Sequence, residues 1–162
     1  MNAQNVLEYF GPHAATLIIG FVSALVPIVN IELFLLAAGT VASGSFPVWT
    51  LGVSAGFGQM VGKCIPYWGA RAAINSQVGR KFSSERVDAL RRRMGAMNPW
   101  VLSGFNFVSA LIGVPPFLLV SVLAGIIEMG FWQFAATGLT GRVIRLVAIV
   151  TFPHAIKGLF IG

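Results

Sequence analysis

Charged residues are scarce in this sequence. They make up 10% of its 162 residues, whereas a soluble domain carries about 25%. From Ala14 to Gly62 the only charged residue is Glu32, and from Met94 to Gly141 the only one is Glu128. Because about 20 apolar residues already span a bilayer, runs of this length exclude a water-soluble core. They predict membrane segments instead.

Several functional classes lack the residues that they need. Cys64 is the single cysteine, which excludes an internal disulfide and a cysteine-rich metal site. The segment before the first apolar run has no Lys or Arg, so it does not read as a secretion signal. We find no phosphate-binding glycine loop with lysine, no paired zinc-ligand spacing and no histidine beside a nucleophile. The sequence therefore predicts no enzyme activity, no cofactor and no metal.

The basic residues that are present gather in one segment. Seven of the eleven lie between Arg71 and Arg93. Apolar runs on both sides argue against a nucleic-acid partner, and the positive-inside rule predicts that residues 71–96 are cytoplasmic in a plasma-membrane or inner-membrane protein. A short amphipathic helix is expected here, capped by Ser84 and ended by Gly95. Its basic face would rest on anionic headgroups.

The chain reads as a duplication, because its second half repeats features of its first half. The pentapeptide FVSAL occurs twice at an offset of 86 residues. Farther along, once a gap of three residues is allowed, a tryptophan aligns with a tryptophan and a glycine with a glycine. The matching pairs are Phe21 with Phe107, Trp49 with Trp132, and Gly58 with Gly141. We therefore expect one membrane domain of two repeats.

Each half has an interrupted apolar run followed by an unbroken one. The runs are 14–43 and 48–70 in the first half, and 98–127 and 130–152 in the second. The expected organisation is repeat 1 at about 14–71, a cytoplasmic linker at 72–97 and repeat 2 at about 98–154.

The interruptions lie near the centre of their runs. Pro27 and Asn30 break the first run, and Gly113, Pro115 and Pro116 break the second. Proline cannot complete the helix ladder, Asn30 is a good N-cap, and Pro116 suits a first helical position. A kinked span and a re-entrant hairpin both fit. We favour hairpins, because a hairpin plus one span in each half produces two inverted repeats, as in many transporters. The predicted fold is an all-α integral membrane protein.

Five charged residues fall in or near the expected hydrocarbon region: Glu32, Lys63, Glu128, Arg142 and Arg145. A charge at the membrane centre costs about 2.5–3.5 kcal/mol and usually marks function. Arg142 is expected near mid-membrane, with Arg145 one turn on and on the same face. Glu32 needs a cationic partner, for which either arginine is the candidate. Lys63 can also snorkel to the surface, and Glu128 is expected at an interface.

The helices that follow the two breaks would begin near the centre of the protein. Helix N-termini bind anions. With Arg142, Arg145 and Lys63 added, the centre suits a phosphate group. Glu32 is then the proton-responsive element, because an approaching anion favours the neutral form of a carboxyl group.

These segments resemble the DedA family, also called VTT-domain or SNARE-associated membrane proteins. The resemblance covers about residues 20–150 and rests on VPIVNIELFLLAAG, GFGQMVGKCIPYWGAR, GVPPFLLVSVLAGIIEM and the closing GRVIR. Glu32 matches the family's hairpin acid, and Arg142 and Arg145 match its late basic pair. The chain departs from many members in two stretches: FNFVSALIGVPP holds no basic residue, and YWGAR stands where Tyr-x-x-Gly-Arg is common.

The resemblance implies two opposed re-entrant hairpins and movement of lipid across the bilayer. In bacteria the cargo would be a polyprenyl phosphate carrier such as undecaprenyl phosphate, with proton coupling. In eukaryotic relatives it would be phospholipid, moved by scrambling. We therefore expect a flippase-like or scramblase-like transporter whose partners are membrane lipids, an anionic phospholipid or a polyprenyl phosphate. A small-ion channel or carrier and a non-transporting assembly factor are the alternatives. The oligomeric state stays open, and a homo-oligomer is compatible with the sequence.

Overall fold

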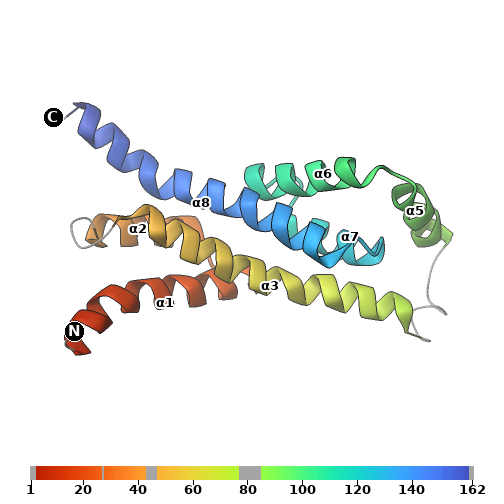
Figure 1. The fold of residues 1–162 in the computed structure, drawn as a ribbon, viewed down its shortest axis with the longest axis horizontal. Coiled ribbons are helices and arrows are strands. Elements are labelled where there is room, and N and C mark those ends of the chain that lie inside the picture. The colour runs from red at the N-terminus through yellow and green to blue at the C-terminus, as the bar shows by residue number, and fades with distance from the viewer. Residues whose placement is uncertain (1–2, 27, 43–46, 77–84, 161–162) are drawn as a thin grey trace. The chain divides into compact units, whose positions relative to one another are not determined.

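The described part of the chain is entirely α-helical apart from its turns. The computed structural model describes residues 3–26, 28–42, 47–76 and 85–160, and no strand occurs among them. The helices are α1 (Ala3–Leu25), α2 (Ile31–Ala42), α3 (Trp49–Asn75), α5 (Glu85–Gly95), α6 (Pro99–Ile112), α7 (Phe117–Ile126) and α8 (Phe131–Phe160) (Figure 1). The all-α prediction is thus confirmed.

The first interrupted run forms a helical hairpin. Helix α1 ends at Leu25, α2 begins at Ile31, and the two helices contact each other (Figure 1). The Asn30 side chain caps α2, because its Oδ1 accepts the backbone N–H groups of Glu32 at 2.9 Å and Leu33 at 3.3 Å. Pro27, the other predicted break residue, lies outside the described residues. The chain therefore reverses at this break, and α1 and α2 are not one kinked helix.

The second interrupted run forms a hairpin in the same way. Helix α6 ends at a left-handed Gly113, whose φ of 87° suits a residue without a side chain. The Val114–Pro115 peptide is cis, and the Ser109 hydroxyl donates to the Pro115 carbonyl at 2.8 Å. Pro116 is the N-cap of α7, one residue before the first helical position that the sequence predicts for it.

The chain divides into two compact units. Unit 1 comprises residues 1–62 and 142–162, and unit 2 comprises residues 63–141. Helices α3 and α8 each contribute one part to unit 1 and another to unit 2. Each unit therefore combines one hairpin with a part of both long helices.

Unit 1 is held by apolar packing and close helix contacts. Its core is formed by Ile31, Leu35, Leu51, Ala55, Leu146 and Val150. Helices α1 and α3 lie so close that a Cβ atom on Gly58 would be 2.0 Å from the carbonyl oxygen of Leu17. Only glycine fits there, which is how small residues allow membrane helices to pack.

Unit 2 has an aromatic core and a comparable close contact. The Tyr67 ring stacks on Phe134 with centroids 4.7 Å apart, and Phe134 stacks on Phe117 at 6.0 Å. A Cβ atom on Gly141 in α8 would be 2.7 Å from the carbonyl oxygen of Phe107 in α6. Glycine again sets the distance between a hairpin helix and a long helix.

One described segment, Phe131–Phe152 in α8, is long and apolar enough to cross a membrane. Shorter apolar helices occupy Gly11–Leu25, Pro99–Ile112 and Phe117–Ile126. The amphipathic segment forms α5, which ends at Gly95 as predicted. Its expected cap, Ser84, lies outside the described residues.

Candidate anion-binding site

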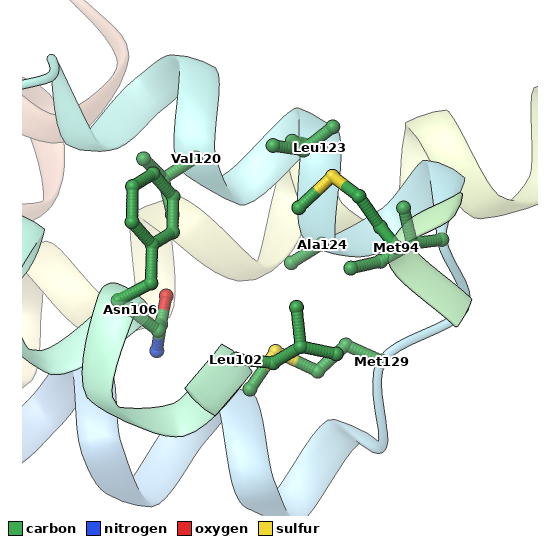
Figure 2. Close-up of a pocket in the computed structure, with 9 residues that line it drawn as sticks. Met94, Leu102, Asn106, Val120, Leu123, Ala124 and Met129 are labelled. Atoms are coloured by element: carbon green, nitrogen blue, oxygen red, sulfur yellow. The ribbon is translucent and has the colours of Figure 1, made fainter. Parts of the chain in front are cut away.

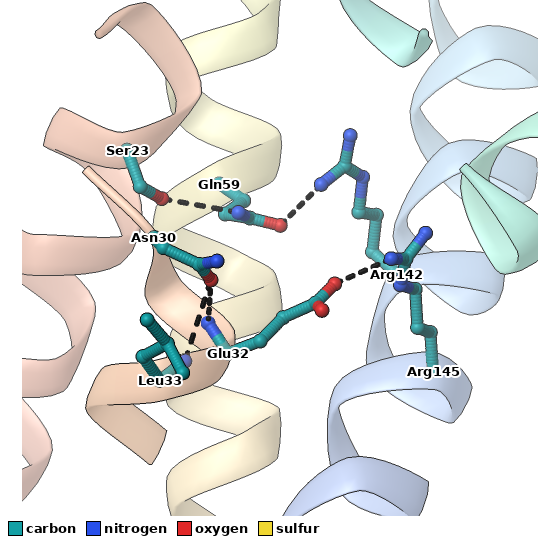
Figure 3. Close-up of polar contacts among 7 residues, drawn as sticks. All are labelled: Ser23, Asn30, Glu32, Leu33, Gln59, Arg142 and Arg145. Carbon is teal, nitrogen blue, oxygen red and sulfur yellow. Dashed lines mark hydrogen bonds and ion pairs between the residues drawn. The ribbon is translucent and has the colours of Figure 1, made fainter. Parts of the chain in front are cut away.

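Glu32 lies in the first turn of α2, two residues after the Asn30 cap. The N-terminal end of a helix carries partial positive charge, so the backbone itself favours a carboxylate there. The side chain also pairs with a cation: Arg145 Nη2 of α8 donates to Glu32 Oε1 (Figure 3). Of the two arginines that the sequence offers as partners of Glu32, Arg145 is the one that forms the ion pair.

The ion pair remains within reach of a ligand. The side chains of Glu32 and Arg145 are 36% and 27% exposed. A partly exposed pair can exchange one of its contacts for a contact to an incoming group. It therefore differs from a fully buried pair, where losing one partner strands the other charge.

Arg142 lies one helical turn before Arg145 and is held by an amide. Arg142 Nη1 donates to Gln59 Oε1 of α3, and Gln59 Nε2 donates to Ser23 Oγ of α1 at 3.0 Å (Figure 3). The Ser23 hydroxyl in turn donates to the Gly20 carbonyl at 2.8 Å. Helices α1, α3 and α8 are therefore linked by one chain of hydrogen bonds.

Gln59 is the site residue that the sequence reasoning missed. It is only 4% exposed, and buried amides in an apolar helix need partners. A signal was available, because the alignment that places Gly58 on Gly141 also places Gln59 on Arg142. The two residues that correspond in the repeat are the two that contact each other.

The other predicted charged residues lie in unit 2. Lys63 is 5% exposed and lies one turn beyond Gln59 along α3. Glu128 lies between α7 and α8, accepts from Asn75 Nδ2 at 3.0 Å and pairs with Arg91 of α5. The Asn75 hydrogen bond, followed by the Arg91 contact, lowers the pKa of Glu128 below its usual value. This carboxylate joins α3 and α5 to the turn between α7 and α8.

A small cavity lies in unit 2 between α5, α6 and α7. Its interior has room for about one water molecule. The walls are apolar apart from Asn106, which lies at one end of the cavity (Figure 2). Asn106 Nδ2 donates to the Phe134 carbonyl at 3.0 Å and to Thr137 Oγ1 at 2.7 Å, while its Oδ1 has no hydrogen-bond partner among the described residues. Unit 2 therefore has polar groups, but this cavity offers no charge to an anion.

We call Ser23, Glu32, Gln59, Arg142 and Arg145 the unit 1 cluster. Its side chains are of the kind that suits an oxyanion. Two guanidinium groups one turn apart present several N–H donors, and guanidinium geometry matches phosphate oxygens. Among the described residues, no group of three His, Cys, Asp or Glu side chains could hold a metal ion.

Comparison with known families agrees with the resemblance in the sequence. The model of a family described as the VTT domain matches residues 26–154, a span that begins directly after α1 and includes α2, the α6–α7 hairpin and the residues Glu32, Gln59, Arg142 and Arg145. A search of curated proteins and a search of solved structures give no match.

Proposed function

This chain belongs to the VTT-domain family, the DedA or SNARE-associated family of membrane proteins, and from that premise we propose that it transports an anionic lipid across the bilayer. The cargo is a phospholipid or a polyprenyl phosphate, moved without chemical change. The transport is of the flippase or scramblase type.

The observation that carries this proposal is the unit 1 cluster. Arg142 contacts the neutral amide of Gln59 on α3, and Arg145 contacts the carboxylate of Glu32 on α2. An anionic headgroup can replace Glu32 as the partner of Arg145 while Gln59 keeps Arg142 in place. Glu32 is then released from its ion pair with Arg145. We propose that this release couples headgroup binding to a proton, as the family resemblance implies.

We also propose a membrane arrangement of two inverted repeats with re-entrant hairpins. Two observations support it. Helices α2 and α7 begin at Ile31 and Phe117, which are separated by the same 86 residues as the sequence repeat. The glycines that correspond in the repeat, Gly58 and Gly141, each bring a long helix against the first helix of a hairpin.

The proposed location is the plasma or inner membrane, with several crossings and residues 71–96 in the cytoplasm. Single cysteines at positions 85–92, introduced into a Cys64→Ser background, test the orientation. Impermeant thiol reagents added to intact cells should leave them unlabelled, and disruption of the membrane should expose them. Ready labelling of intact cells would contradict the orientation.

Transport itself is tested with purified protein in liposomes that carry lipids of different headgroups. We expect movement of anionic lipids to exceed that of zwitterionic lipids and to fall in Arg142→Ala. Ion flux without lipid movement would identify a channel or carrier instead. Absence of both, in folded protein, would favour an assembly factor.

A further inference from the structure

We infer that the cavity between α5, α6 and α7 binds the hydroxyl end of an uncharged, linear primary alcohol, whose proton is accepted by the side-chain carbonyl of Asn106. The cavity belongs to unit 2. It uses none of the residues of the unit 1 cluster, and the inference does not depend on the proposed lipid transport.

The Asn106 amide is buried with only one of its two ends in use. The residue is 1% exposed. Its Nδ2 donates to the Phe134 carbonyl at 3.0 Å and to Thr137 Oγ1 at 2.7 Å. Its Oδ1 has no hydrogen-bond partner among the residues that the structure describes. Because buried polar side-chain atoms nearly always have a partner, this oxygen indicates a donor from outside the described residues.

The orientation of this amide is fixed by its two neighbours in α8. The Thr137 hydroxyl donates its single proton to the Gln133 carbonyl at 2.7 Å, so its oxygen accepts from Asn106. The Phe134 carbonyl can only accept. Turning the amide over would place Oδ1 against two acceptors. The end without a partner is therefore an acceptor, and a ligand beside it has to donate a hydrogen bond.

The walls of the cavity suit an uncharged and largely apolar ligand. Helix α7 contributes Val120 and Ala124, α5 contributes Met94, and the turn after α7 contributes Met129. Among the described lining residues, no side chain is charged. A phosphate or ammonium group would lose its hydration here without gaining a counter-charge. Charged headgroups are therefore poor ligands for this cavity.

A water molecule fits the volume of the cavity but not its chemistry. The interior has room for about one water molecule. Buried waters typically make about three hydrogen bonds, whereas the lining side chains offer Asn106 Oδ1 and the weakly accepting sulfur atoms of Met94 and Met129. An alcohol has one proton to donate to Oδ1, and its carbon chain contacts the apolar walls. The alcohol therefore matches the cavity better than water does.

The shape of the cavity restricts the alcohol to a slim chain. Room for about one water molecule admits a hydroxyl on an unbranched carbon but excludes a ring. Asn106 lies at one end of the cavity and Met94 of α5 at the other (Figure 2). Met94 is half-buried, so its end is the more open one. A hydroxyl on Asn106 therefore directs the chain past Met94 and out of the cavity.

The experiment uses the purified protein in detergent with isotope-labelled methionine methyl groups, followed by NMR. The probe is n-hexanol, and its isomer methyl pentyl ether has the same atoms but no O–H donor. The Met94 and Met129 resonances should respond to n-hexanol at about three- to tenfold lower concentration than to the ether, the range of a neutral hydrogen bond. Met60 and Met97 do not line this cavity, so they report general effects of the probe on the detergent.

Variants separate the acceptor from the space. Asn106→Ala removes the acceptor, so the alcohol and the ether should bind equally well. Ala124→Val fills part of the cavity and leaves the Asn106 amide in place, so it should weaken n-hexanol binding about tenfold or more. Ala136→Val is the matched control, because it makes the same change at an exposed position of α8 that does not line this cavity. It should keep the wild-type affinity.

The comparison of the two isomers on wild-type protein decides the matter even where a variant does not fold. Equal affinities for alcohol and ether would overturn the inference. Unchanged Met94 and Met129 resonances would also overturn it, since the cavity would then hold water only or remain empty. Equal responses of Met60 and Met97 would contradict it as well, because the probe would then act through the detergent. None of these results bears on lipid transport, which is measured in liposomes.

Discussion

The two units use one helical scaffold for different chemistry. In unit 1 the hairpin α1–α2 packs on α3 through Gly58, and in unit 2 the hairpin α6–α7 packs on α8 through Gly141. Both glycines exclude any side chain, because a Cβ atom would overlap a carbonyl oxygen of the first hairpin helix. The units therefore share a short distance between the backbone of a long helix and the backbone of the first hairpin helix.

The difference between the units lies at the tips of the hairpins. Asn30 and Glu32 occupy the first tip, and the repeat places Pro116 and Leu118 at the corresponding positions of the second. The capping amide and the carboxylate of unit 1 are thus replaced by a proline and an apolar side chain. The two units thus have the same close helix packing. The cluster of Glu32, Arg142 and Arg145 lies in unit 1. The proposed headgroup site is accordingly asymmetric.

The largest expected effect comes from breaking the shared scaffold. Gly58→Ala places a methyl group 2.0 Å from the Leu17 carbonyl oxygen, and backbone atoms cannot move away easily. We expect a loss of about 3 kcal/mol, the upper part of the range for overpacking. Thermal unfolding in detergent measures it. Gly141→Ala, with a closest approach of 2.7 Å, should destabilise less.

Gly69→Ala is the control on the same helix as Gly58. A Cβ atom on Gly69 would meet nothing within 4 Å, so alanine should leave the unfolding temperature unchanged or raise it slightly, because alanine favours helix. Equal unfolding temperatures for Gly58→Ala and Gly69→Ala would mean that the close contact between α1 and α3 is not present in the folded protein.

An intermediate effect is expected from the buried amide of unit 2. Asn106→Ala removes the donor to the Phe134 carbonyl and to Thr137 Oγ1. The loss should be about 1–3 kcal/mol, as for other buried polar groups that lose a partner. Lipid headgroup preference should stay as in the wild type, since this residue carries no charge. A changed preference for anionic lipid would show that the units share the site chemistry.

The smallest effect concerns the Glu128 contacts that hold α5 in unit 2. Because its pKa is lowered in the folded state, the stabilisation from this carboxylate is present at neutral pH and is lost as the pH falls through the lowered value. Glu128→Gln should therefore increase hydrogen exchange in α5 slightly at neutral pH and abolish its increase on acidification. The contacts are partly exposed, so the change should be small. If hydrogen exchange in α5 of the variant still increased on acidification as in the wild type, a group other than Glu128 would be responsible for that increase.

Much of this architecture could be predicted from local signals. The breaks at Asn30 and Gly113 are visible because amide caps and glycine or proline have strong backbone preferences. The need of Glu32 for a cation follows from the energy of a charge in hydrocarbon. These signals lie within a few residues of the feature that they predict.

Partners across long sequence separations could not be chosen in this way. Arg142 and Arg145 lie one turn apart in α8, and the sequence does not distinguish them as partners of Glu32. Only the packing of α2 on α8 decides which of them contacts Glu32. Gln59 was overlooked because a neutral amide in a glycine-rich helix has no distinctive local pattern, and its one signal, the alignment with Arg142, appears only when the two halves are compared. The division into units was also hidden, because α3 and α8 are continuous in sequence and contribute to both.

The central claim is that headgroup binding belongs to the arginine cluster of unit 1 and not to the polar residues of unit 2. It is tested most directly by measuring translocation of an anionic phospholipid in liposomes with wild-type protein, Arg142→Ala and Asn106→Ala, each checked for folding by thermal unfolding. We predict a fall of about tenfold or more in Arg142→Ala, as for the loss of a charged hydrogen-bond donor. Asn106→Ala should retain most of the wild-type rate per folded molecule. An unchanged rate in folded Arg142→Ala, or a larger loss in Asn106→Ala, would contradict the account.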